Sequence, residues 1–347
     1  MKTIHLINDF NSNFYLDLFS NFKKNDHLVL SSYRVKKHKL NNDYRNLNVI
    51  HKYFKNRVLV LSYFFTIIKI YKKKSTIIHT HNSSFEGILA LLCKKILGIE
   101  FVFTIRNTDI SKTIKNKLGV LFFNYILSES KYIVLKTKAY QDFIEEKHQS
   151  KIKFIPNGLN QFWIDNFTFE KSKVVNPINI ICVADFYYNK NHKNLFTAIE
   201  SINKTKVVCK LTLVARDQGD CIEEVFKKIK NSEYIHFKGA LKKQELLEEY
   251  RNADIFCMNS FYETFGLVYL EALSQQLPII YTLNQGVDGL IPKNYGEGCS
   301  TDSLSIEKAI LNQINNINNK NYTQVSKEFI NSFDWKKIAL DYEKLYR

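Results

Sequence analysis

Residues 254–273 read DIFCMNSFYETFGLVYLEAL, in which an apolar run, a short polar loop and a second apolar run follow one another. The first run predicts a buried strand over Asp254–Met258, and the second predicts a helix that begins near Phe265. Glu263 then lies on the loop above the strand, and Glu271 lies about two turns into the helix at ~1.5 Å of rise per residue. A buried strand that leads into a helix is the repeating unit of a parallel α/β sheet.

The same alternation recurs along the chain. Short, fully apolar runs predict strands of parallel sheets that are covered on both faces. The expected strands are Thr3–Asn8, His27–Ser31, Thr76–Thr80, Phe101–Thr104, Tyr132–Leu135, Ile178–Ala184, Lys210–Val214, Tyr234–Phe237, Asp254–Met258 and Leu277–Thr282. The expected helices include Phe85–Leu97, Ile114–Ser128, Leu195–Ile202, Cys221–Lys230 and Lys243–Arg251. This order predicts two successive doubly wound, Rossmann-like domains.

Length and local sequence suggest where the two domains meet. At 347 residues the chain exceeds one ordinary core and suits two domains. The segment Ile155-Pro156-Asn157-Gly158 contains the residues that most often break regular structure. We therefore expect a first domain over residues 1–157 and a second over 158–330. Ligands should bind at the carboxyl ends of the strands, in a cleft that the two domains face.

Positive charge is concentrated in the first domain. Residues 1–157 hold 27 Lys and Arg against 11 Asp and Glu, whereas residues 158–347 hold 23 of each. A genome-wide preference for lysine would load both halves alike, so the asymmetry favours an anionic partner such as lipid, nucleic acid or a phosphorylated acceptor. The sequence has neither a helix-turn-helix nor an RRM signature, so we expect no nucleic acid partner.

Cysteine spacing and the apolar runs indicate the compartment. The six cysteines form no Cys-x-x-Cys pair and no zinc spacing, which favours reduced thiols in the core. The chain opens directly into an expected strand, and its longest apolar stretch, Val58–Ile68, is shorter than the ~20 residues of a membrane span. We expect a cytoplasmic protein, with peripheral association to the inner face of the cytoplasmic membrane as a hypothesis.

The loop and helix start around Glu263 suit a diphosphate. Backbone N–H groups of Phe265, Gly266 and Leu267 would point at a ligand on the helix N-terminus, where the helix dipole also favours negative charge. A carboxylate beside that position can accept hydrogen bonds from two vicinal sugar hydroxyls. The spacing alone fits equally well a capped amphipathic helix with two incidental acids, so both interpretations stay open at this point.

Residues 260–273 resemble the E-x7-E segment of the family 4 (group 1) glycosyltransferases, which have the GT-B fold and retain anomeric configuration. The resemblance is continuous over the second half and a pattern only in the first. It implies that residues 331–347 form a helix that crosses back to the first domain. The other segments that resemble the family are Ile155–Gly158, Lys190–His192 with Leu195 and Ala198, Lys238–Ala240 leading through Tyr250 to Asp254, Leu277–Ile280 followed by Gly286, and Phe333–Tyr346.

The resemblance implies roles for individual residues. Glu263 would contact hydroxyls of the donor sugar and Lys190 would neutralise the diphosphate leaving group, which makes these two the candidate catalytic residues. Glu271 would hold the ribose hydroxyls of the nucleotide. The family mechanism uses no metal ion and no other cofactor. The remaining candidate donor-binding residues are Phe265, Gly266, Leu267, Thr264, Arg216, Ala240 and Leu241.

The chain departs from the family pattern at three places. No arginine precedes Lys190 in the segment Val183–Tyr188, and Asp185 has the wrong sign for a phosphate, so Arg216 or Lys193 would have to compensate. The first loop, Asn8–Asn13, contains no glycine. Arg106 stands where the family often has a histidine. These departures bear on rate and donor choice more than on fold.

The first domain supplies the candidate acceptor or cleft residues, which are His81, Arg106, Asn107 and Asn11. His79 and His81 end one strand and point to the same side, so we expect them to line the cleft rather than to bind a metal ion. Arg106 would contact a sugar or phosphate, or form a surface salt bridge.

Basic segments in the first domain indicate a membrane partner. Residues Ser111–Ser128 begin basic and become apolar, and Arg34–Lys39 and Tyr71–Lys74 add positive charge. A basic amphipathic helix can dock on an anionic membrane, where each nearby lysine contributes about 1 kcal/mol. The alternative is a core helix whose first lysines are solvated.

Taken together, we predict a metal-independent, retaining hexosyltransferase of the GT-B type. The donor would be a UDP- or GDP-linked sugar and the acceptor a lipid-linked glycan, in synthesis of capsule, O-antigen or similar lipopolysaccharide. Two alternatives share the fold, namely a degenerate, non-catalytic GT-B partner subunit and a nucleotide-sugar epimerase. The presence of both Glu263 and Glu271 argues against a degenerate chain.

Overall fold

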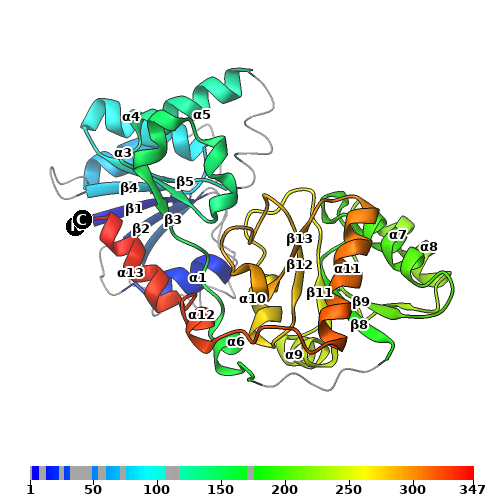
Figure 1. The fold of residues 1–347 in the computed structure, drawn as a ribbon. Coiled ribbons are helices and arrows are strands. Elements are labelled where there is room, and N and C mark those ends of the chain that lie inside the picture. The colour runs from blue at the N-terminus through cyan, green and yellow to red at the C-terminus, as the bar shows by residue number, and fades with distance from the viewer. Residues whose placement is uncertain are drawn as a thin grey trace. The chain divides into compact units, whose positions relative to one another are not determined.

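The computed structural model describes residues 2–7, 13–22, 27–31, 49–53, 60–70, 76–83, 85–106, 109, 117–169 and 176–347. It contains two compact units (Figure 1). Unit 1 comprises Met1–Asn160 together with Phe333–Arg347, and unit 2 comprises Gln161–Ser332. Each unit is built around its own parallel sheet.

Unit 1 contains a seven-stranded sheet in the order β3-β2-β1-β4-β5-β6-β7, in which all neighbouring strands run parallel. The strand order therefore reverses between β1 and β4. The strands are β1 (Lys2–Ile7), β2 (His27–Ser31), β3 (Val49–Tyr53), β4 (Thr76–Thr80), β5 (Phe101–Thr104), β6 (Tyr132–Leu135) and β7 (Ile152–Phe154). The described helices are α1 (Asn13–Ser20), α3 (Val60–Ile70), α4 (Phe85–Leu97), α5 (Lys117–Glu129) and α13 (Trp335–Leu345), with short 3-10 helices η3 (Lys138–Phe143) and η4 (Glu146–Lys151).

Helices cover both faces of this sheet. Helices α3, α4 and α5 pack on one face, and α1 and α13 pack on the other (Figure 1). The strands send alternate side chains to the two cores, so that Ile78 and Phe103 face α3–α5 whereas Ile77 and Val102 face α13. Burial on both faces explains why these strands read as continuous apolar runs.

The last helix of the chain packs on unit 1, although unit 2 precedes it in the sequence. Asp334 caps α13 by accepting a hydrogen bond from the N–H of Lys336. Gly158 lies against the indole of Trp335, where a Cβ would come within 2.3 Å of the ring. The glycine of the Ile155–Gly158 segment is therefore required by the close approach of this tryptophan.

Unit 2 contains a six-stranded parallel sheet in the order β10-β9-β8-β11-β12-β13. Its strand order reverses between β8 and β11. The strands are β8 (Ile178–Val183), β9 (Cys209–Val214), β10 (Ile235–Phe237), β11 (Ile255–Cys257), β12 (Ile279–Thr282) and β13 (Gly296–Cys299). The helices are α6 (Gln161–Asp165), α7 (His192–Ile202), α8 (Ile222–Lys230), α9 (Lys243–Asn252), α10 (Leu267–Ser274), α11 (Ser303–Asn318) and α12 (Lys327–Asn331), with η5 (Tyr188–Lys190) and η6 (Lys293–Tyr295).

The prediction of two doubly wound parallel sheets is confirmed, and every expected strand is present within two residues of its predicted ends. Strands β3, β7 and β13 were not predicted from the sequence. All three are edge strands, which are not enclosed by neighbours on both sides and so carry no continuous apolar run. For example, β13 reads GEGC.

Two further expectations concern the cysteines and the membrane. All six cysteines are free, and five of them are buried, as expected for core thiols. Among the described residues, no helix combines the length and the apolar character needed to cross a bilayer.

Candidate active site

In unit 2 the candidate site residues gather where the strand order reverses. At such a point the loops that leave the two adjacent strands run to opposite sides, which leaves a crevice at the carboxyl ends of the strands. The reversal lies between β8 and β11. The loop after β8 carries Lys190, and the loop after β11 carries Glu263. The topology alone therefore brings these two residues to the position at which doubly wound folds bind ligands.

Lys190 and Glu263 form an ion pair across this crevice. Nζ of Lys190 lies 2.7 Å from Oε2 of Glu263, and both side chains are largely buried. The backbone joins the same two loops, because the N–H of Phe261 donates to the carbonyl oxygen of Asn189 at 2.8 Å. The pair combines an ammonium that can neutralise phosphate with a carboxylate that can accept hydrogen bonds from hydroxyls.

Contacts on both sides hold the Glu263 loop. The N–H of Glu263 donates to Oε1 of Gln285 at 3.1 Å, and the backbone carbonyl oxygen of Glu263 accepts from the N–H of Gly286 at 2.8 Å. Gly286 has a φ of +53°, and a Cβ there would lie 3.1 Å from Cγ of Glu263. Glycine at this position therefore leaves room for the Glu263 side chain. No signal in the sequence had pointed to Gln285.

The backbone that leads from Glu263 into α10 carries further candidate donor-binding residues. Thr264 and Phe265 lie on this loop, and Leu267 is the first residue of α10. The Phe265 ring is buried, so Phe265 can offer a ligand only its backbone. Its N–H lies 3.5 Å from Oε1 of Glu263, which places the carboxylate against the same turn of backbone.

Helix α10 begins later than predicted, at Leu267 rather than near Phe265. Its N-cap is Gly266, which has a φ of +75°, and a Cβ there would come within 2.6 Å of the ring of Tyr269. Glycine has no side chain with which to cap the helix, which leaves this N-terminus suited to an anion. Because the helix starts late, Glu271 lies about one turn into it, and the prediction of two turns was wrong.

Glu271 is held inside unit 2 by a buried tyrosine. The hydroxyl of Tyr250 lies 3.2 Å from Oε2 of Glu271. Burial raises the pKa of Glu271 to about 7, although the Tyr250 hydrogen bond and the charge of Lys243 act in the opposite direction. The carboxyl group is therefore balanced between its two protonation states near neutral pH, and a ligand that donates hydrogen bonds would favour the carboxylate.

Arg216 and Asp185 are paired with each other. Nε of Arg216 lies 3.1 Å from Oδ2 of Asp185, and Nη2 contacts the same oxygen more closely. Gln218 adds a hydrogen bond to this carboxylate at 2.9 Å. Burial opposes ionisation of Asp185, but the hydrogen bonds from Arg216 outweigh it and lower the pKa of Asp185. The acidic departure from the family pattern is thus neutralised within the chain, and the role of Arg216 toward a phosphate stays a prediction.

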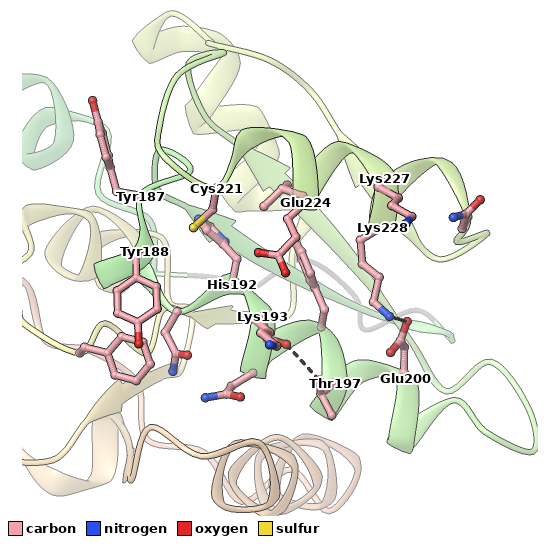
Figure 2. Close-up of a pocket in the computed structure, with 16 residues that line it drawn as sticks. Tyr187, Tyr188, His192, Lys193, Thr197, Glu200, Cys221, Glu224, Lys227 and Lys228 are labelled. Carbon is pink, nitrogen blue, oxygen red and sulfur yellow. Dashed lines mark hydrogen bonds and ion pairs between the residues drawn. The ribbon is translucent and has the colours of Figure 1, made fainter.

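Ala240 and Leu241 lie at the same edge of the sheet as Arg216. The N–H of Ala215 donates to the carbonyl oxygen of Gly239 at 3.2 Å, which ties the end of β9 to the end of β10. Ala240 is exposed and Leu241 is half-buried. The loop after β8 also borders a groove of about 710 Å³ between α7 and α8 (Figure 2).

In unit 1, Arg106 lies at the carboxyl edge of the sheet, just after β5. Its Nη2 donates to the hydroxyl of Tyr15 at 2.6 Å, and its guanidinium lies over the same ring, 5.0 Å from the centroid. Its backbone N–H donates to Oδ2 of Asp109 at 2.8 Å. The guanidinium is therefore placed by an aromatic residue of α1. Asn11 and Asn107, the other two acceptor candidates, lie outside the described residues, as do Arg34–Lys39 and Tyr71–Lys74.

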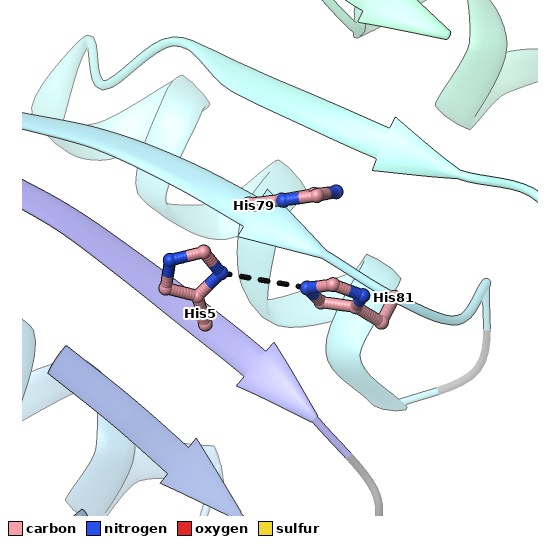
Figure 3. Close-up of side chains that lie close together, drawn as sticks. All are labelled: His5, His79 and His81. Atoms are coloured by element: carbon pink, nitrogen blue, oxygen red, sulfur yellow. Dashed lines mark hydrogen bonds between the residues drawn. The ribbon is translucent and has the colours of Figure 1, made fainter. Parts of the chain in front are cut away.

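His5, His79 and His81 converge in unit 1 (Figure 3). Strands β1 and β4 pair with His5 opposite His79, and the rings of His79 and His81 stack with centroids 4.0 Å apart. Nδ1 of His5 lies 3.4 Å from Nε2 of His81. The prediction that His79 and His81 point to the same side is confirmed. His5 was missed because it lies 76 positions from His81 and only the strand register brings it close.

The histidine cluster suits a hydrogen-bond network better than a metal ion. One ring nitrogen from each of the three histidines lies within 4.8 Å of the others, a spacing that a metal ion could bridge. However, His79 already contacts the Tyr346 hydroxyl at 2.6 Å and Oγ1 of Thr104 at 2.7 Å. Burial lowers the pKa of His79, and the charges of Lys136 and Arg106 lower it further. These positive groups would repel a cation. The expectation that the cluster binds no metal ion remains a prediction.

The histidines are also enclosed. His5, His79 and His81 are fully buried, so in this state none of them can touch an acceptor directly. Lys136 is buried beside them and contacts the hydroxyl of Tyr342 on α13. His79 and His81 are predicted from the sequence to line a cleft, whereas in the structure they lie beneath the surface of unit 1.

Residues 164–329 match the sequence model of the glycosyl transferases of group 1. The alpha-monoglucosyldiacylglycerol synthase of Acholeplasma laidlawii is 26% identical over 249 residues, which cover 64% of this chain and 62% of that protein. An uncharacterized glycosyltransferase of Methanocaldococcus jannaschii is 24% identical over 324 residues, which cover 88% of this chain and 86% of that protein.

Solved structures share the fold of the whole chain. The HepE protein of Anabaena in complex with UDP has a TM-score of 0.75 at 15% identity, and the match covers 99% of each chain. The lipopolysaccharide outer core galactosyltransferase WaaB has a TM-score of 0.74 at 12% identity, over 99% of this chain and 98% of that chain. The fold is therefore that of the GT-B glycosyltransferases. The second unit, which contains the matched residues and the Lys190–Glu263 pair, is thus similar in sequence to the group 1 glycosyltransferases.

Proposed function

We propose that this chain transfers a hexose from a UDP- or GDP-linked donor to a lipid-linked glycan, with retention of anomeric configuration and without a metal ion. The setting we propose is synthesis of a bacterial surface polysaccharide such as capsule or O-antigen. The observation that carries the proposal is the Lys190–Glu263 ion pair, which lies at the ligand-binding edge of the unit that matches the group 1 family.

The chemistry of the site supports these roles. Departure of a nucleoside diphosphate leaves negative charge on the phosphate oxygens, and the ammonium of Lys190 would stabilise that charge. The N-terminus of α10 at Gly266 would favour the same charge. Glu263 would accept hydrogen bonds from the donor sugar, and Glu271 from the ribose. Before the donor binds, the ion pair keeps the side chains of Lys190 and Glu263 oriented. The diphosphate of a bound donor would then compete with Glu263 for Lys190.

The names of similar proteins support the donor and acceptor classes. HepE has been solved with UDP and with UDP-glucose, which supports a nucleotide-sugar donor. The Acholeplasma relative is named for synthesis of a glucosyl lipid, which supports a lipid acceptor. WaaB is named for the outer core of lipopolysaccharide, which supports a role in surface polysaccharide synthesis.

Calorimetry with UDP, GDP, ADP and CMP tests the donor site. We expect one nucleotide to bind with micromolar affinity, about −8 kcal/mol, and the Glu271→Ala variant to lose most of that binding. Incubation of the matching nucleotide-sugars with lipid-linked acceptors should then give a product of unchanged anomeric configuration, with or without EDTA. Failure to bind any of the nucleotides would favour a non-catalytic subunit, and an epimerised sugar without transfer would favour an epimerase.

An apolar surface on unit 1 supports contact with a membrane. Helices α3, α4 and α5 lie next to one another on one face of the sheet, and each exposes large apolar side chains (Figure 1). On α4 these recur at every fourth residue, so they form one stripe. Apolar surface of this extent commonly marks a protein or membrane contact. The exposed apolar residues of the three helices are Phe65, Ile68, Ile88, Leu92, Ile96, Leu118, Leu121 and Tyr125.

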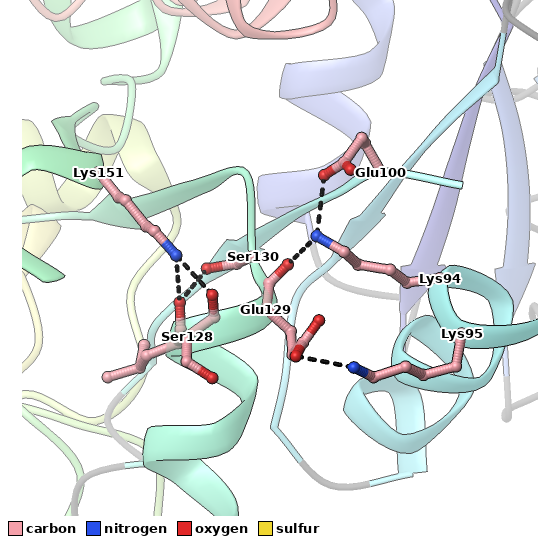
Figure 4. A network of polar contacts seen from close by, with 8 residues as sticks. Lys94, Lys95, Glu100, Ser128, Glu129, Ser130 and Lys151 are labelled. Carbon is pink, nitrogen blue, oxygen red and sulfur yellow. Dashed lines mark hydrogen bonds and ion pairs between the residues drawn. The ribbon is translucent and has the colours of Figure 1, made fainter. Parts of the chain in front are cut away.

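Only part of the lysine excess is available to such a membrane. Lys94 donates to the carbonyl oxygen of Glu129, and Lys151 donates to the carbonyl oxygens of Leu127 and Ser128, so both stabilise the C-terminus of α5 (Figure 4). Lys69, Lys95 and Lys117 are exposed on the three helices that carry the apolar surface, although Lys95 pairs with Glu129 at 2.9 Å. Exposed apolar and positive side chains on the same three helices support the peripheral contact with anionic lipid that we propose.

Flotation with liposomes tests this part of the proposal. The protein should float with vesicles that contain phosphatidylglycerol and much less with phosphatidylcholine alone. The double variant Leu118→Asp/Leu121→Asp should lose flotation, because both side chains are strongly exposed on α5. Leu304→Asp/Leu311→Asp is the matched control, since these exposed leucines lie on α11 of unit 2. Flotation that neither lipid charge nor the α5 variant alters would contradict the membrane contact.

A further inference from the structure

We propose that the groove between α7 and α8 of unit 2 is a second carbohydrate-binding site, which holds a distal sugar of the glycan on which the candidate active site acts (Figure 2). This inference rests on the proposed function. The groove has a volume of about 710 Å³, within the range of roughly 300–1,000 Å³ that small-molecule sites occupy. Lys190, Glu263 and Glu271 do not line it, and of the residues considered for the donor phosphate it includes Lys193 alone.

An exposed aromatic platform stands at one end of the groove. The ring of Tyr188 stacks on the ring of Phe261, with centroids 5.2 Å apart and planes inclined by 26°. Tyr188 is nevertheless 67% exposed, so its other side is open to solvent. Aromatic faces carry partial negative charge, whereas the C–H groups on one face of a sugar ring carry partial positive charge. A supported and exposed tyrosine ring is therefore a platform on which a sugar can stack.

The platform is held in place by its backbone. The N–H of Tyr188 donates to Oδ1 of Asp220 at 2.6 Å, and the N–H of Phe261 donates to the carbonyl oxygen of Asn189 at 2.8 Å. The two rings are thus fixed by neighbouring loops before any ligand arrives. A preformed platform loses little conformational entropy when a sugar binds.

A buried hydrogen-bond acceptor in the groove wall suits a hydroxyl donor. Nε2 of His192 lies 3.1 Å from the carbonyl oxygen of Asp185. A carbonyl oxygen can only accept, so Nε2 carries the proton and Nδ1 of the neutral ring is an acceptor. His192 is only 4% exposed, and within the described part of the chain its Nδ1 has no hydrogen-bond partner. Nδ1 is itself shielded from solvent, so a hydroxyl donor has to enter the groove wall to satisfy this acceptor.

The rim of the groove is polar but has little net charge. Lys228 pairs with Glu200 at 2.5 Å, which links α8 to α7 (Figure 2). The rim also offers Lys193, Glu224 and the amide of Asn231. Such a mixture supplies donors and acceptors for hydroxyl groups without the concentrated positive charge that a phosphate or nucleic acid would need.

The two loops that carry the aromatic platform, those after β8 and β11, also carry the candidate active site. Tyr188 precedes Lys190 by two residues, and Phe261 precedes Glu263 by two residues. An oligosaccharide whose reacting end lies near the Lys190–Glu263 pair can therefore extend over the platform. A second contact of this kind would make the protein bind glycans of several sugars better than single sugars.

Saturation-transfer NMR on the full-length protein tests the inference. The probes are methyl α-glucoside, methyl α-galactoside, methyl α-mannoside and N,N′-diacetylchitobiose at millimolar concentration. We expect transfer to the ring protons of at least one probe, and we expect Tyr188→Ala to remove at least four-fifths of that signal. Glu224→Ala should weaken it without removing it. Tyr322→Ala, which removes an exposed tyrosine elsewhere in unit 2, should leave it unchanged.

The same samples separate this inference from the proposed function. UDP, GDP, ADP and CMP are titrated into wild type and Tyr188→Ala, and nucleotide binding should be equal in both, which also shows that the variant is folded. Nucleotide binding without saturation transfer to any probe would overturn the carbohydrate groove and leave the donor site standing. Transfer that persists in Tyr188→Ala would also overturn it. If the wild type binds none of the four nucleotides, the proposed function itself is contradicted.

Discussion

The two units place polar residues at corresponding points of two similar sheets, yet the two clusters differ in character. In unit 2, a lysine and a glutamate pair at the carboxyl edge between β8 and β11, and a second glutamate lies close by on α10. In unit 1, three histidines occupy the region between β1 and β4, where they are fully buried. The cluster of unit 2 carries opposite charges and is partly exposed, whereas that of unit 1 is enclosed.

This difference indicates a division of labour between the units. A cluster that combines a cation, carboxylates and a free helix N-terminus can bind a diphosphate and sugar hydroxyls. A cluster of buried imidazoles and tyrosine hydroxyls forms hydrogen bonds within itself, and the bond from His79 to Tyr346 fixes α13 to the sheet. Similar topology therefore does not imply similar chemistry. We expect donor binding in unit 2 and a structural role for the histidines of unit 1.

Removal of the lysine should have the largest effect. Lys190→Ala should reduce kcat about 100- to 1,000-fold, because one charge-stabilising group at the leaving phosphate is lost. Steady-state kinetics with the donor identified by calorimetry measures it. Lys204→Ala, at an exposed lysine just beyond α7, is the control and should change kcat less than twofold. If Lys190→Ala keeps nearly full kcat, the charged cluster of unit 2 has no catalytic role that distinguishes it from the histidine cluster of unit 1.

Acid should destabilise unit 1 more than unit 2. Burial lowers the pKa of His5, His79 and His81, so the folded unit binds fewer protons than the unfolded chain once the pH falls below about 6.5. The stability present above that pH is then lost at about 1.4 kcal/mol per pH unit for each imidazole. In unit 2 the raised pKa of Glu271 and the lowered pKa of His192 change the free energy of unfolding with pH in opposite directions.

The two tryptophans can report on the units separately. Trp335 lies in unit 1 and Trp163 in unit 2, so each single-tryptophan variant, Trp163→Phe or Trp335→Phe, follows one unit by fluorescence. Urea unfolding at pH 7.5, 6.5 and 5.5 should show a falling midpoint for unit 1 and a nearly constant midpoint for unit 2. If the urea midpoints of both units fall equally with decreasing pH, the histidines of unit 1 are not the source of acid sensitivity.

Donor affinity should depend on pH through Glu271. The pKa of Glu271 is about 7, above its ordinary value, so the carboxylate that we expect to accept ribose hydroxyls forms as the pH rises from 6 to 8. Affinity should therefore increase over this range, by at most about tenfold per pH unit below the pKa. Glu271→Gln should bind more weakly and with a flat profile. A wild-type profile equally flat would place the ribose away from Glu271.

The smallest expected effect concerns Arg216. Its guanidinium is 66% exposed and already paired with Asp185, and exposed ion pairs contribute about 0.2–1 kcal/mol. Arg216→Ala should therefore weaken nucleotide binding by less than about fivefold. A loss as large as that of Lys190→Ala would instead identify Arg216 as the replacement for the phosphate-binding arginine that the chain lacks.

The sequence could indicate the candidate residues around Glu263 because their signal is local. Glu263, Gly266 and Glu271 lie within nine consecutive residues, and their backbone carries the helix start that such a site needs. Lys190 was found only through the resemblance, since it meets Glu263 across 73 positions of sequence. The start of α10 was misplaced because a positive φ at Gly266 cannot be read from composition.

The polar cluster of unit 1 could not be predicted in the same way. His5 and His81 are brought together by the pairing of β1 with β4, and Tyr342 and Tyr346 reach them from the other end of the chain. Strand order is a tertiary property that local apolar patterns do not fix. The contact between Arg216 and Asp185 was missed for the same reason, because it depends on β8 lying beside β9.

Hydrogen-exchange mass spectrometry, with and without the nucleotide that binds, tests the central claim most directly. If unit 2 holds the donor, the nucleotide should slow exchange in residues 185–192 and 260–275, which carry Lys190, Glu263 and Glu271. Exchange in residues 76–106 of unit 1, around the buried histidines, should not change. Protection confined to residues 76–106, with none around Glu263 and Glu271, would contradict the assignment of the donor site to unit 2.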